Sequence, residues 1–412
     1  MITRREFLGT SALLPLAASL SLEGQSGKPL RLAIVTTIYR YLSHGQHIGD
    51  RFLVGYPIDG EWHKPNIQVV SLYVDQKPEG DLSAERAAEF GFKVYPTIAE
   101  AICCGGSTLA CDAILIVGEH GDYPSNDKGQ KLYPRFEFFE QCREVFEKSG
   151  RSVPLYNDKH LSYSFEKAQK MVQTSRRMRF PMMAGSSLPV TWRLPEVAIP
   201  LGAKIQEALM IGTGGSDAMD FHALEAMQCM VERRAGGETG VRSVQLLDGE
   251  AFWTAEEKGI WSKQLLRSAL SRSDTPLGLT VTDGRTQDLS APGVLQSLVK
   301  KPAAYLIEYR DGLRASMLML DGALKDFNFA ARLSDSSLVS TQFLLTPEPN
   351  VTYSARLVSK IEHMFMTGHE PYPVERTLLT SGMLESCLTS RQQQSRRLET
   401  PHLNVKYAVT ES

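Results

Sequence analysis

Three ionisable residues, Asp158, Lys159 and His160, come one residue after a short apolar run, Val153–Tyr156. An amphipathic segment of about four helical turns comes next, and the apolar run Met182–Ala184 follows it. This spacing predicts a strand, a crossover helix and a second, parallel strand. Ionisable groups at the carboxyl end of such a strand lie where open α/β sheets bind their ligands. The structural alternative is a solvated turn between two buried strands.

The turn after the first expected strand, Leu30–Ile38, contains no glycine-rich phosphate loop. A dinucleotide site needs Gly-x-Gly-x-x-Gly here, so that the backbone can approach the pyrophosphate. By register, Thr36, Ile38 and Tyr41 take the three glycine places. The β-branched Ile38 stands where the backbone would touch phosphate, although a helix N-terminus and nearby polar groups could still hold an anion. The candidate cofactor-binding side chains of this turn are Thr36, Thr37, Tyr39 and Arg40.

Carboxylates also follow two other expected strands. Asp75 comes directly after Ile67–Val74, where an acid can bind a ribose diol, and equally can cap the turn that follows. Glu119 and His120 come shortly after Ala113–Val117, in a loop of the kind in which binding residues concentrate. We therefore include Asp75, Glu119, His120 and Asp158 among the candidate cofactor-binding residues.

A fourth constellation opens a long predicted helix, Ala218–Arg234. His222 lies there near the carboxylates Asp217 and Asp220, and Glu225 follows one turn later. Carboxylates near an imidazole can set its pKa close to neutrality, as proton transfer requires. The alternative is structural, because Asp217 is also a good helix cap.

Histidine spacing raises the possibility of a metal. His44, His47 and Asp50 recur at i, i+3 and i+6, which places them on one helix face. Imidazoles and carboxylates together bind divalent cations, but such histidines are more often polar surface groups. We predict no metal site, and we keep a metal-assisted reaction open if these histidines converge with the others expected near the cleft, namely His120, His160 and His222.

The elements expected to position these residues fall into two domains, as is usual for a chain of 412 residues. Strands alternate with helices over residues 30–185, which predicts a Rossmann-like, doubly wound parallel sheet. Longer alternating runs follow over residues 186–412 and predict an α+β domain with a mostly antiparallel sheet. Residues 256–301 are a probable insertion, and Leu403–Tyr407 is expected to be the last strand.

These segments together resemble the Gfo/Idh/MocA oxidoreductase family over nearly the whole chain after the leader. Asp158-Lys159-His160 resembles its E-K-P segment, and residues 214–225 resemble its D-x-G-x-H-x-x-D helix, with His222 and Glu225 in the last two places. The resemblance implies Lys159, His222 and Asp217 as catalytic residues. It implies NAD or NADP as cofactor, a carbohydrate-like substrate and a possible homo-oligomer. The candidate substrate-binding residues are His160, Asp220 and Glu225.

The N-terminus resembles a twin-arginine export signal. Residues 1–29 hold Arg4-Arg5 followed by Phe7-Leu8 and a mildly apolar stretch, which predicts a periplasmic or otherwise exported protein. A net charge of −2 and the absence of long basic runs argue against nucleic acid, and no later apolar run is long enough to span a membrane. Six cysteines without a Cys-x-x-Cys pair are expected to be buried thiols.

Two functions remain open. One is an exported oxidoreductase that transfers hydride between a tightly bound nicotinamide cofactor and a sugar or cyclitol hydroxyl. The other keeps the fold without the cofactor: a divergent carbohydrate-active lyase, hydrolase or isomerase, with or without a metal, or a non-catalytic sugar-binding protein. Asp75, Lys159 and His222 match positions of the resembled family and favour the first function. The absence of the family's glycines from the first turn favours the second.

Overall fold

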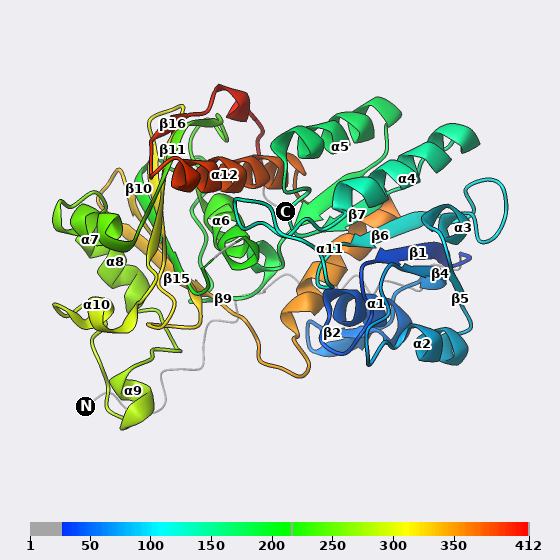
Figure 1. The fold of residues 1–412 in the computed structure, drawn as a ribbon, viewed down its shortest axis with the longest axis horizontal. Coiled ribbons are helices and arrows are strands. Elements are labelled where there is room, and N and C mark those ends of the chain that lie inside the picture. Colours follow the sequence, from blue (N-terminus) through cyan, green and yellow to red (C-terminus); the bar gives the residue numbers. More distant parts are fainter. Residues whose placement is uncertain (1–26, 216, 411–412) are drawn as a thin grey trace, which may run out of the picture.

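The computed structural model describes residues 27–215 and 217–410. Arg4 and Arg5 of the expected export signal lie outside the described residues. The described chain forms two sheets with their helices, the first on the right of Figure 1 and the second on the left. No helix in the described ranges has the length and apolar character needed to cross a bilayer.

The first sheet is parallel throughout, with strand order β5-β4-β1-β6-β7-β8. It confirms the expected Rossmann-like domain, and its strand order reverses direction between β1 and β6, where such sheets bind ligands. The strands are β1 Leu30–Thr36, β4 Ile67–Val74, β5 Lys93–Tyr95, β6 Ala113–Val117, β7 Leu155–Asp158 and β8 Met182–Gly185. A small hairpin, β2 Tyr56–Ile58 with β3 Glu61–His63, was not expected from the sequence.

Helices cover both faces of the first sheet because successive β1 side chains point to opposite sides. Ala33 and Val35 pack with α3, α4 and α5, whereas Leu32 and Ile34 pack with α1. Helix α11, which comes from far along the chain, completes the face that α1 covers. The helices are α1 His44–Val54, α2 Ser83–Phe90, α3 Ile98–Ile102, α4 Arg135–Ser149, α5 Phe165–Met178 and α11 Tyr353–Thr367.

The second sheet has the order β16-β11-β12-β13-β10-β14-β15-β9 and is antiparallel except between β10 and β13. This confirms the mostly antiparallel α+β domain. Its strands are β9 Arg193–Leu194, β10 Ile205–Gly212, β11 Val241–Asp248, β12 Ala303–Tyr309, β13 Arg314–Met319, β14 Phe327–Leu333, β15 Leu338–Phe343 and β16 Leu398–Glu399. The expected last strand, Leu403–Tyr407, is wrong: a 3₁₀ turn, Pro401–Leu403, precedes a single bridge from Tyr407 to Glu238.

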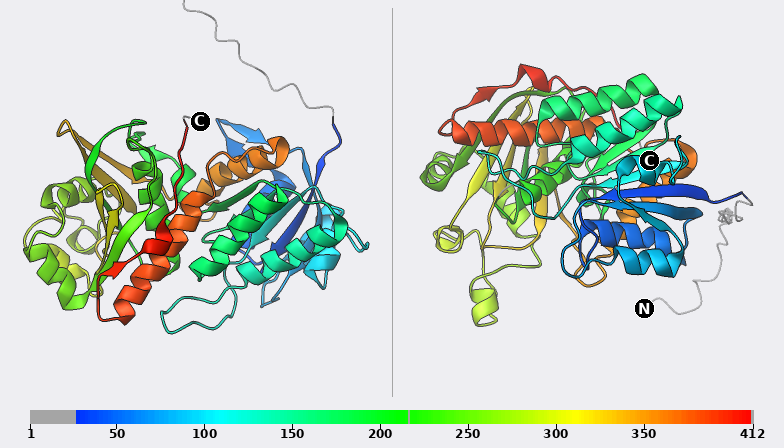
Figure 2. Two further views of the ribbon diagram at one scale, coloured as in Figure 1. Left: turned by 90° about the horizontal axis from the view of Figure 1, so that it is seen from above. Right: turned by 45° about the vertical axis from the view of Figure 1, so that its right-hand side comes forward.

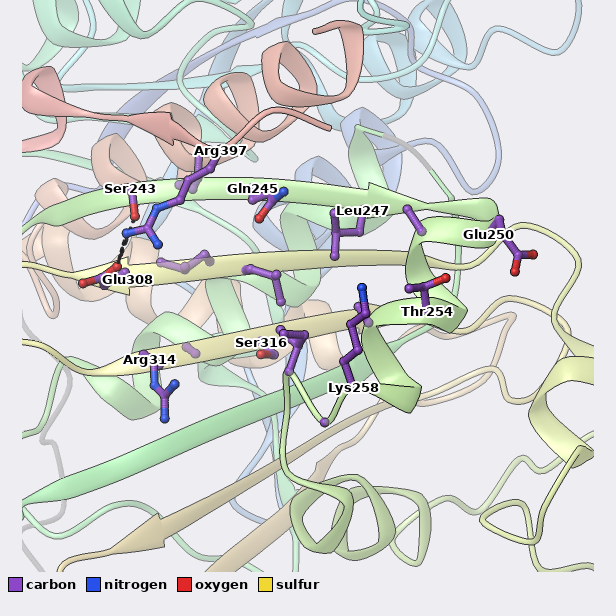
Figure 3. A pocket seen from close by; sticks show the side chains of 18 residues that line it. Ser243, Gln245, Leu247, Glu250, Thr254, Lys258, Glu308, Arg314, Ser316 and Arg397 are labelled. Atoms are coloured by element: carbon purple, nitrogen blue, oxygen red, sulfur yellow. Dashed lines mark hydrogen bonds and ion pairs between the residues drawn. The ribbon is translucent and has the colours of Figure 1, made fainter. Parts of the chain in front are cut away.

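Helices also lie on both faces of the second sheet. Helices α6 Ala218–Val231 and α12 Glu375–Gln392 pack on the face toward the first domain, with α12 running between the two sheets (Figure 2). On the other face lie α7 Gly249–Glu257 and three short helices within residues 256–301: α8 Lys263–Leu270, α9 Leu279–Thr282 and α10 Val294–Leu298. These helices cover part of this face. Beside α7, over β11–β13, lies a cavity of about 710 Å³ (Figure 3).

Candidate active site

Lys159 lies directly after β7, at the carboxyl edge of the first sheet. Its side chain is 4% exposed, and its φ of +59° is in the left-handed region that a lysine rarely adopts. Its backbone N–H donates to the Gly185 carbonyl at 3.2 Å, so the end of β8 holds it in this conformation. Strained residues that the surrounding structure holds in place are concentrated at functional sites.

Glu119 holds the Lys159 ammonium from the neighbouring strand end. Its Oε1 lies 3.4 Å from Lys159 Nζ, and its Oε2 accepts a hydrogen bond from the Arg135 guanidinium. Burial alone would raise the pKa of Glu119, but Lys159 and Arg135 together hold it well below its usual range. Glu119 is therefore an ionised carboxylate between two buried cations.

Arg135, a fully buried arginine, was not among the candidate residues. It opens α4, where the helix dipole disfavours a cation. That mismatch was the only sign in the sequence that Arg135 has a specific acidic partner.

His160 and Asp217 form a second contact on the far side of Arg135. His160 Nε2 accepts from Arg135 at 3.2 Å and lies 3.6 Å from Asp217 Oδ1. Burial, then Arg135, lowers the pKa of His160 well below its usual value, whereas burial raises that of Asp217. The other oxygen of Asp217 accepts the Lys131 backbone N–H at 3.1 Å. Asp217 thus contacts His160 instead of His222.

His222, on the first turns of α6, is partnered by a serine. Its Nδ1 lies 2.5 Å from Ser186 Oγ, in the segment that leaves the first sheet after Gly185. The backbone of Lys159 is hydrogen-bonded to Gly185, and Ser186 is the next residue, so Lys159 and His222 contact consecutive residues of one segment. Burial, then Lys159 and His44, lowers the pKa of His222 well below its usual value.

Glu225 lies behind this contact. Its Oε2 accepts the Ser186 backbone N–H at 3.3 Å, and its Oε1 accepts the Thr380 hydroxyl at 2.6 Å. Gly185 is required here, because a Cβ would lie 2.5 Å from Glu225 Oε2 and φ is +127°. Burial raises the pKa of Glu225 to about 6. Glu225 is fully buried and positions the Ser186 segment.

A histidine group borders the same site from α1 and the β6 loop. His44 Nδ1 lies 2.7 Å from Asp158 Oδ2, and the His44 ring is 5.2 Å from that of His120 and 4.8 Å from that of His47. Burial, then His44, lowers the pKa of His120 to about 4. His160 bonds elsewhere, and within residues 27–215 and 217–410 no three His, Cys, Asp or Glu side chains are arranged to hold a metal ion.

Asp220 points away from this cluster. Its Oδ2 accepts the hydroxyl of Tyr305 on β12, and its side chain is 1% exposed. Burial raises its pKa to about 6. The contacts of Asp220 are therefore those of a buried group of the second domain.

The candidate cofactor residues of the first turn are bonded to the chain itself. Thr36 Oγ1 lies 3.0 Å from the carbonyls of both Ile38 and Val117, and the Thr37 hydroxyl donates to the Glu119 carbonyl at 2.7 Å. Tyr39 is buried, with its hydroxyl 2.7 Å from Asp50. Arg40 is exposed and pairs through its backbone with Asp81. In this conformation, the polar side chains of Thr36, Thr37 and Tyr39 are all engaged by groups of the chain itself.

Asp75 is also engaged. Its two oxygens accept the hydroxyls of Tyr73 at 2.7 Å and Tyr123 at 2.6 Å. Next to it, the Gln76 amide makes two hydrogen bonds with the backbone of Asp122, at 3.0 and 2.8 Å. These contacts join the β4 and β6 loops across the crevice. Both loops are thus tied to each other by side chains of this chain.

Solved structures share this fold at low sequence identity. GenD2 from gentamicin A biosynthesis, in complex with NAD, aligns with a TM-score of 0.56 and 12% identity, over 91% of this chain and 97% of its own. The myo-inositol dehydrogenase of Lactobacillus casei, in complex with NAD(H) and myo-inositol, aligns with a TM-score of 0.54 and 11% identity, over 93% and 99%. The myo-inositol 2-dehydrogenase of Lactobacillus plantarum gives 0.51 and 12%, over 90% and 99%.

Sequence comparison adds nothing to this likeness: no protein-family model and no curated protein matches the chain. At these identities the structural likeness establishes the fold, whereas activity has to be argued from the site.

Proposed function

We propose that this chain is an oxidoreductase-like enzyme of the Gfo/Idh/MocA type that acts on a sugar or cyclitol. The observation that carries the proposal is that Lys159 and His222, from different domains, contact the consecutive residues Gly185 and Ser186. The shared fold with GenD2 and the L. casei myo-inositol dehydrogenase, both solved with a bound nicotinamide cofactor, supports it.

The chain's own groups suit chemistry at one substrate oxygen. The Lys159 ammonium, oriented by Glu119, is a donor that can bind and polarise that oxygen, and His222 is the second group beside it. NAD or NADP, when bound, would supply the hydride acceptor or donor, with Glu119, His120 and Lys159 at its nicotinamide end. Asp158 and His44 form the adjacent wall.

The turn between β1 and α1, whose polar side chains bond to the chain itself, restricts how a nucleotide can bind. A nucleotide must either displace residues 37–43 together with the contacts between the β4 and β6 loops, or bind with its pyrophosphate shifted from the place it takes in a glycine-rich turn. We expect a nucleotide bound in this way to be held tightly and to remain with the protein on purification.

The same observation favours a second candidate. With the nucleotide seat filled by its own chain, the cluster around Lys159 could serve a cofactor-free lyase or isomerase, or a sugar-binding protein, on the same fold. A metal-assisted version of this reaction has less support, because His160 does not join the histidines of α1.

Nucleotide analysis separates the two candidates. Protein made with its leader intact is denatured, and the released small molecules are identified by mass spectrometry, with elemental analysis for metal. We expect NAD or NADP to be released, or the purified protein to bind one of them when it is added. Protein that releases no nucleotide and has no affinity for either would overturn the oxidoreductase proposal and leave the cofactor-free one.

Export belongs to the proposal as well. The twin-arginine route carries folded proteins, so a cofactor loaded before export would have to be held tightly in a compartment without free nucleotide. The Arg4-Arg5-x-Phe7-Leu8 pattern supports this destination.

A further inference from the structure

The hydrogen bonds of Ser186 determine which ring nitrogen of His222 carries the hydrogen. Ser186 Oγ has two polar neighbours among the described residues: His222 Nδ1 at 2.5 Å and the Leu188 backbone nitrogen at 3.0 Å. The Leu188 N–H can only donate, so Ser186 Oγ accepts from it. Ser186 is 1% exposed, which leaves its own hydroxyl hydrogen without water as an acceptor. The remaining acceptor is His222 Nδ1.

A neutral imidazole has a hydrogen on only one of its two ring nitrogens. A ring nitrogen that accepts a hydrogen bond is the one without that hydrogen. If Nδ1 accepts from Ser186, the ring hydrogen is on Nε2. The opposite arrangement, with Nδ1–H donating to Ser186, would give Oγ two donors and leave its own buried hydrogen unpaired, which costs free energy. The low pKa of His222 agrees with a neutral ring.

We propose that Ser186 fixes His222 in the Nε2–H form, so that Nε2 is the ring nitrogen that carries the hydrogen toward a substrate. This inference rests on the proposed function and adds a residue that orients one of its groups. Ser186 is a positioning residue, because it acts through His222.

His222 is partly exposed, and its Nε2 has no hydrogen-bond partner in the described part of the chain. In the Nε2–H form the ring therefore offers a hydrogen-bond donor on the side away from Ser186.

The segment around Ser186 is built to hold this orientation. Glu225 accepts the Ser186 backbone N–H, and Thr380 fixes the carboxylate from α12. The adjacent Ser187 has no hydrogen bond at its hydroxyl among the described residues, which makes it a matched control.

The tautomer can be observed directly. Protein labelled with ¹⁵N-histidine is studied by long-range ¹H–¹⁵N NMR, with His222→Asn to assign the ring. We expect the wild type to show a protonated Nε2 and an unprotonated Nδ1. Ser186→Ala should lose this preference and populate both tautomers, whereas Ser186→Thr, which keeps the hydroxyl, and Ser187→Ala should retain it. A wild-type ring protonated at Nδ1 overturns the proposal, as does a Ser186→Ala spectrum identical to that of the wild type.

Discussion

Lys159 and His222 reach the candidate site from different domains, and each depends on one buried partner. Glu119 fixes the lysine and Ser186 fixes the histidine. Arg135 in turn fixes Glu119, so a network of buried partners sets the charge of the site. Neutralising Glu119 would leave two buried cations unpaired, which is a strongly destabilising change.

Substitution of either end group should lower turnover without unfolding the protein. We expect Lys159→Ala and His222→Ala each to reduce kcat for a keto-cyclitol or sugar substrate by about 10²–10⁴-fold, because positioned proton-transfer groups typically contribute that much. Steady-state kinetics measure the loss, with circular dichroism to show that the fold is intact. Lys170→Ala is the matched control, since that exposed lysine contacts only Glu166 on its own helix. Full activity in both site variants would remove Lys159 and His222 from the mechanism.

Asp220 should make the stability of the protein depend on pH. Burial raises its pKa to about 6 in the folded chain, against about 3.9 when unfolded. The contribution of the protonated Asp220 carboxyl to the free energy of unfolding is therefore fully present below about pH 4. It is lost as the pH rises through 6, which lowers the free energy of unfolding by roughly 3 kcal/mol. Urea unfolding at pH 4 and pH 7 should show a pH dependence that differs between the wild type and Asp220→Asn by about this amount, because the other titrating groups, such as Glu225, are common to both. The exposed Asp283→Asn should behave as the wild type does, and equal pH dependence in Asp220→Asn would refute the assignment.

At the scale of elements, two loops decide whether the fold can hold a nucleotide. Residues 37–43 fill the turn between β1 and α1, and residues 118–134 run from β6 toward α12, where Arg391 donates to the Lys128 carbonyl at 3.0 Å (Figure 2). Gln76 and Tyr123 connect the second loop to the end of β4. The closure is therefore made by a few side chains, and the order of the strands beneath it remains that of a nucleotide-binding sheet.

Removing those side chains should raise nucleotide affinity. Gln76→Ala combined with Tyr123→Phe deletes three hydrogen bonds across the crevice and frees one oxygen of Asp75. If a nucleotide must open these loops to bind, its dissociation constant should fall by up to about 10²-fold, because three net hydrogen bonds of about 1 kcal/mol each no longer have to be broken. Calorimetric titration with NAD measures it. Tyr163→Phe, whose hydroxyl bonds to Lys167 on α5, is the control, and an unchanged affinity in the double variant would show that the loops do not gate the seat.

At the scale of the whole molecule, the two domains are joined by more than one crossing of the chain. Helix α11 completes a face of the first sheet, although it follows the last long strand of the second. Helix α12 then contacts α5, α6 and β11, so it packs on elements of both domains. A protein assembled in this way has its candidate site at the junction, where Lys159 and His222 are held in a fixed relation.

The proposed export route makes a prediction for the complete chain. Replacing Arg4 and Arg5 by lysine should keep the protein in the cytoplasm, because the twin-arginine route recognises the arginine pair. Fractionation of cells, with immunoblotting of periplasm and cytoplasm, measures this. Replacing Lys28, which lies after the apolar stretch, by arginine is the control. Unchanged appearance of the twin-lysine protein in the periplasm would show that the leader has another function.

Much of the fold was predictable because strands and helices leave local patterns. The runs Ile67–Val74 and Ala113–Val117 became strands with the expected bounds. Leu403–Tyr407 failed because alternation alone does not supply a partner strand, and only Tyr407 finds a bridge.

The candidate site was predictable only in part, and the reason is physical. Lys159 and His222 stand at positions that the succession of elements marks as functional, so the sequence alone indicates them. Their partners are different: Ser186, Arg135 and the hydroxyls that engage Asp75 belong to no motif, and each acts on a residue distant along the chain. Hydrogen-bond partners of this kind exist only once packing has brought the segments together. The sequence by itself therefore determined which elements form and which residues stand at their ends. The tertiary structure decided which side chains contact each other, including those that engage the turn after β1 and Asp75.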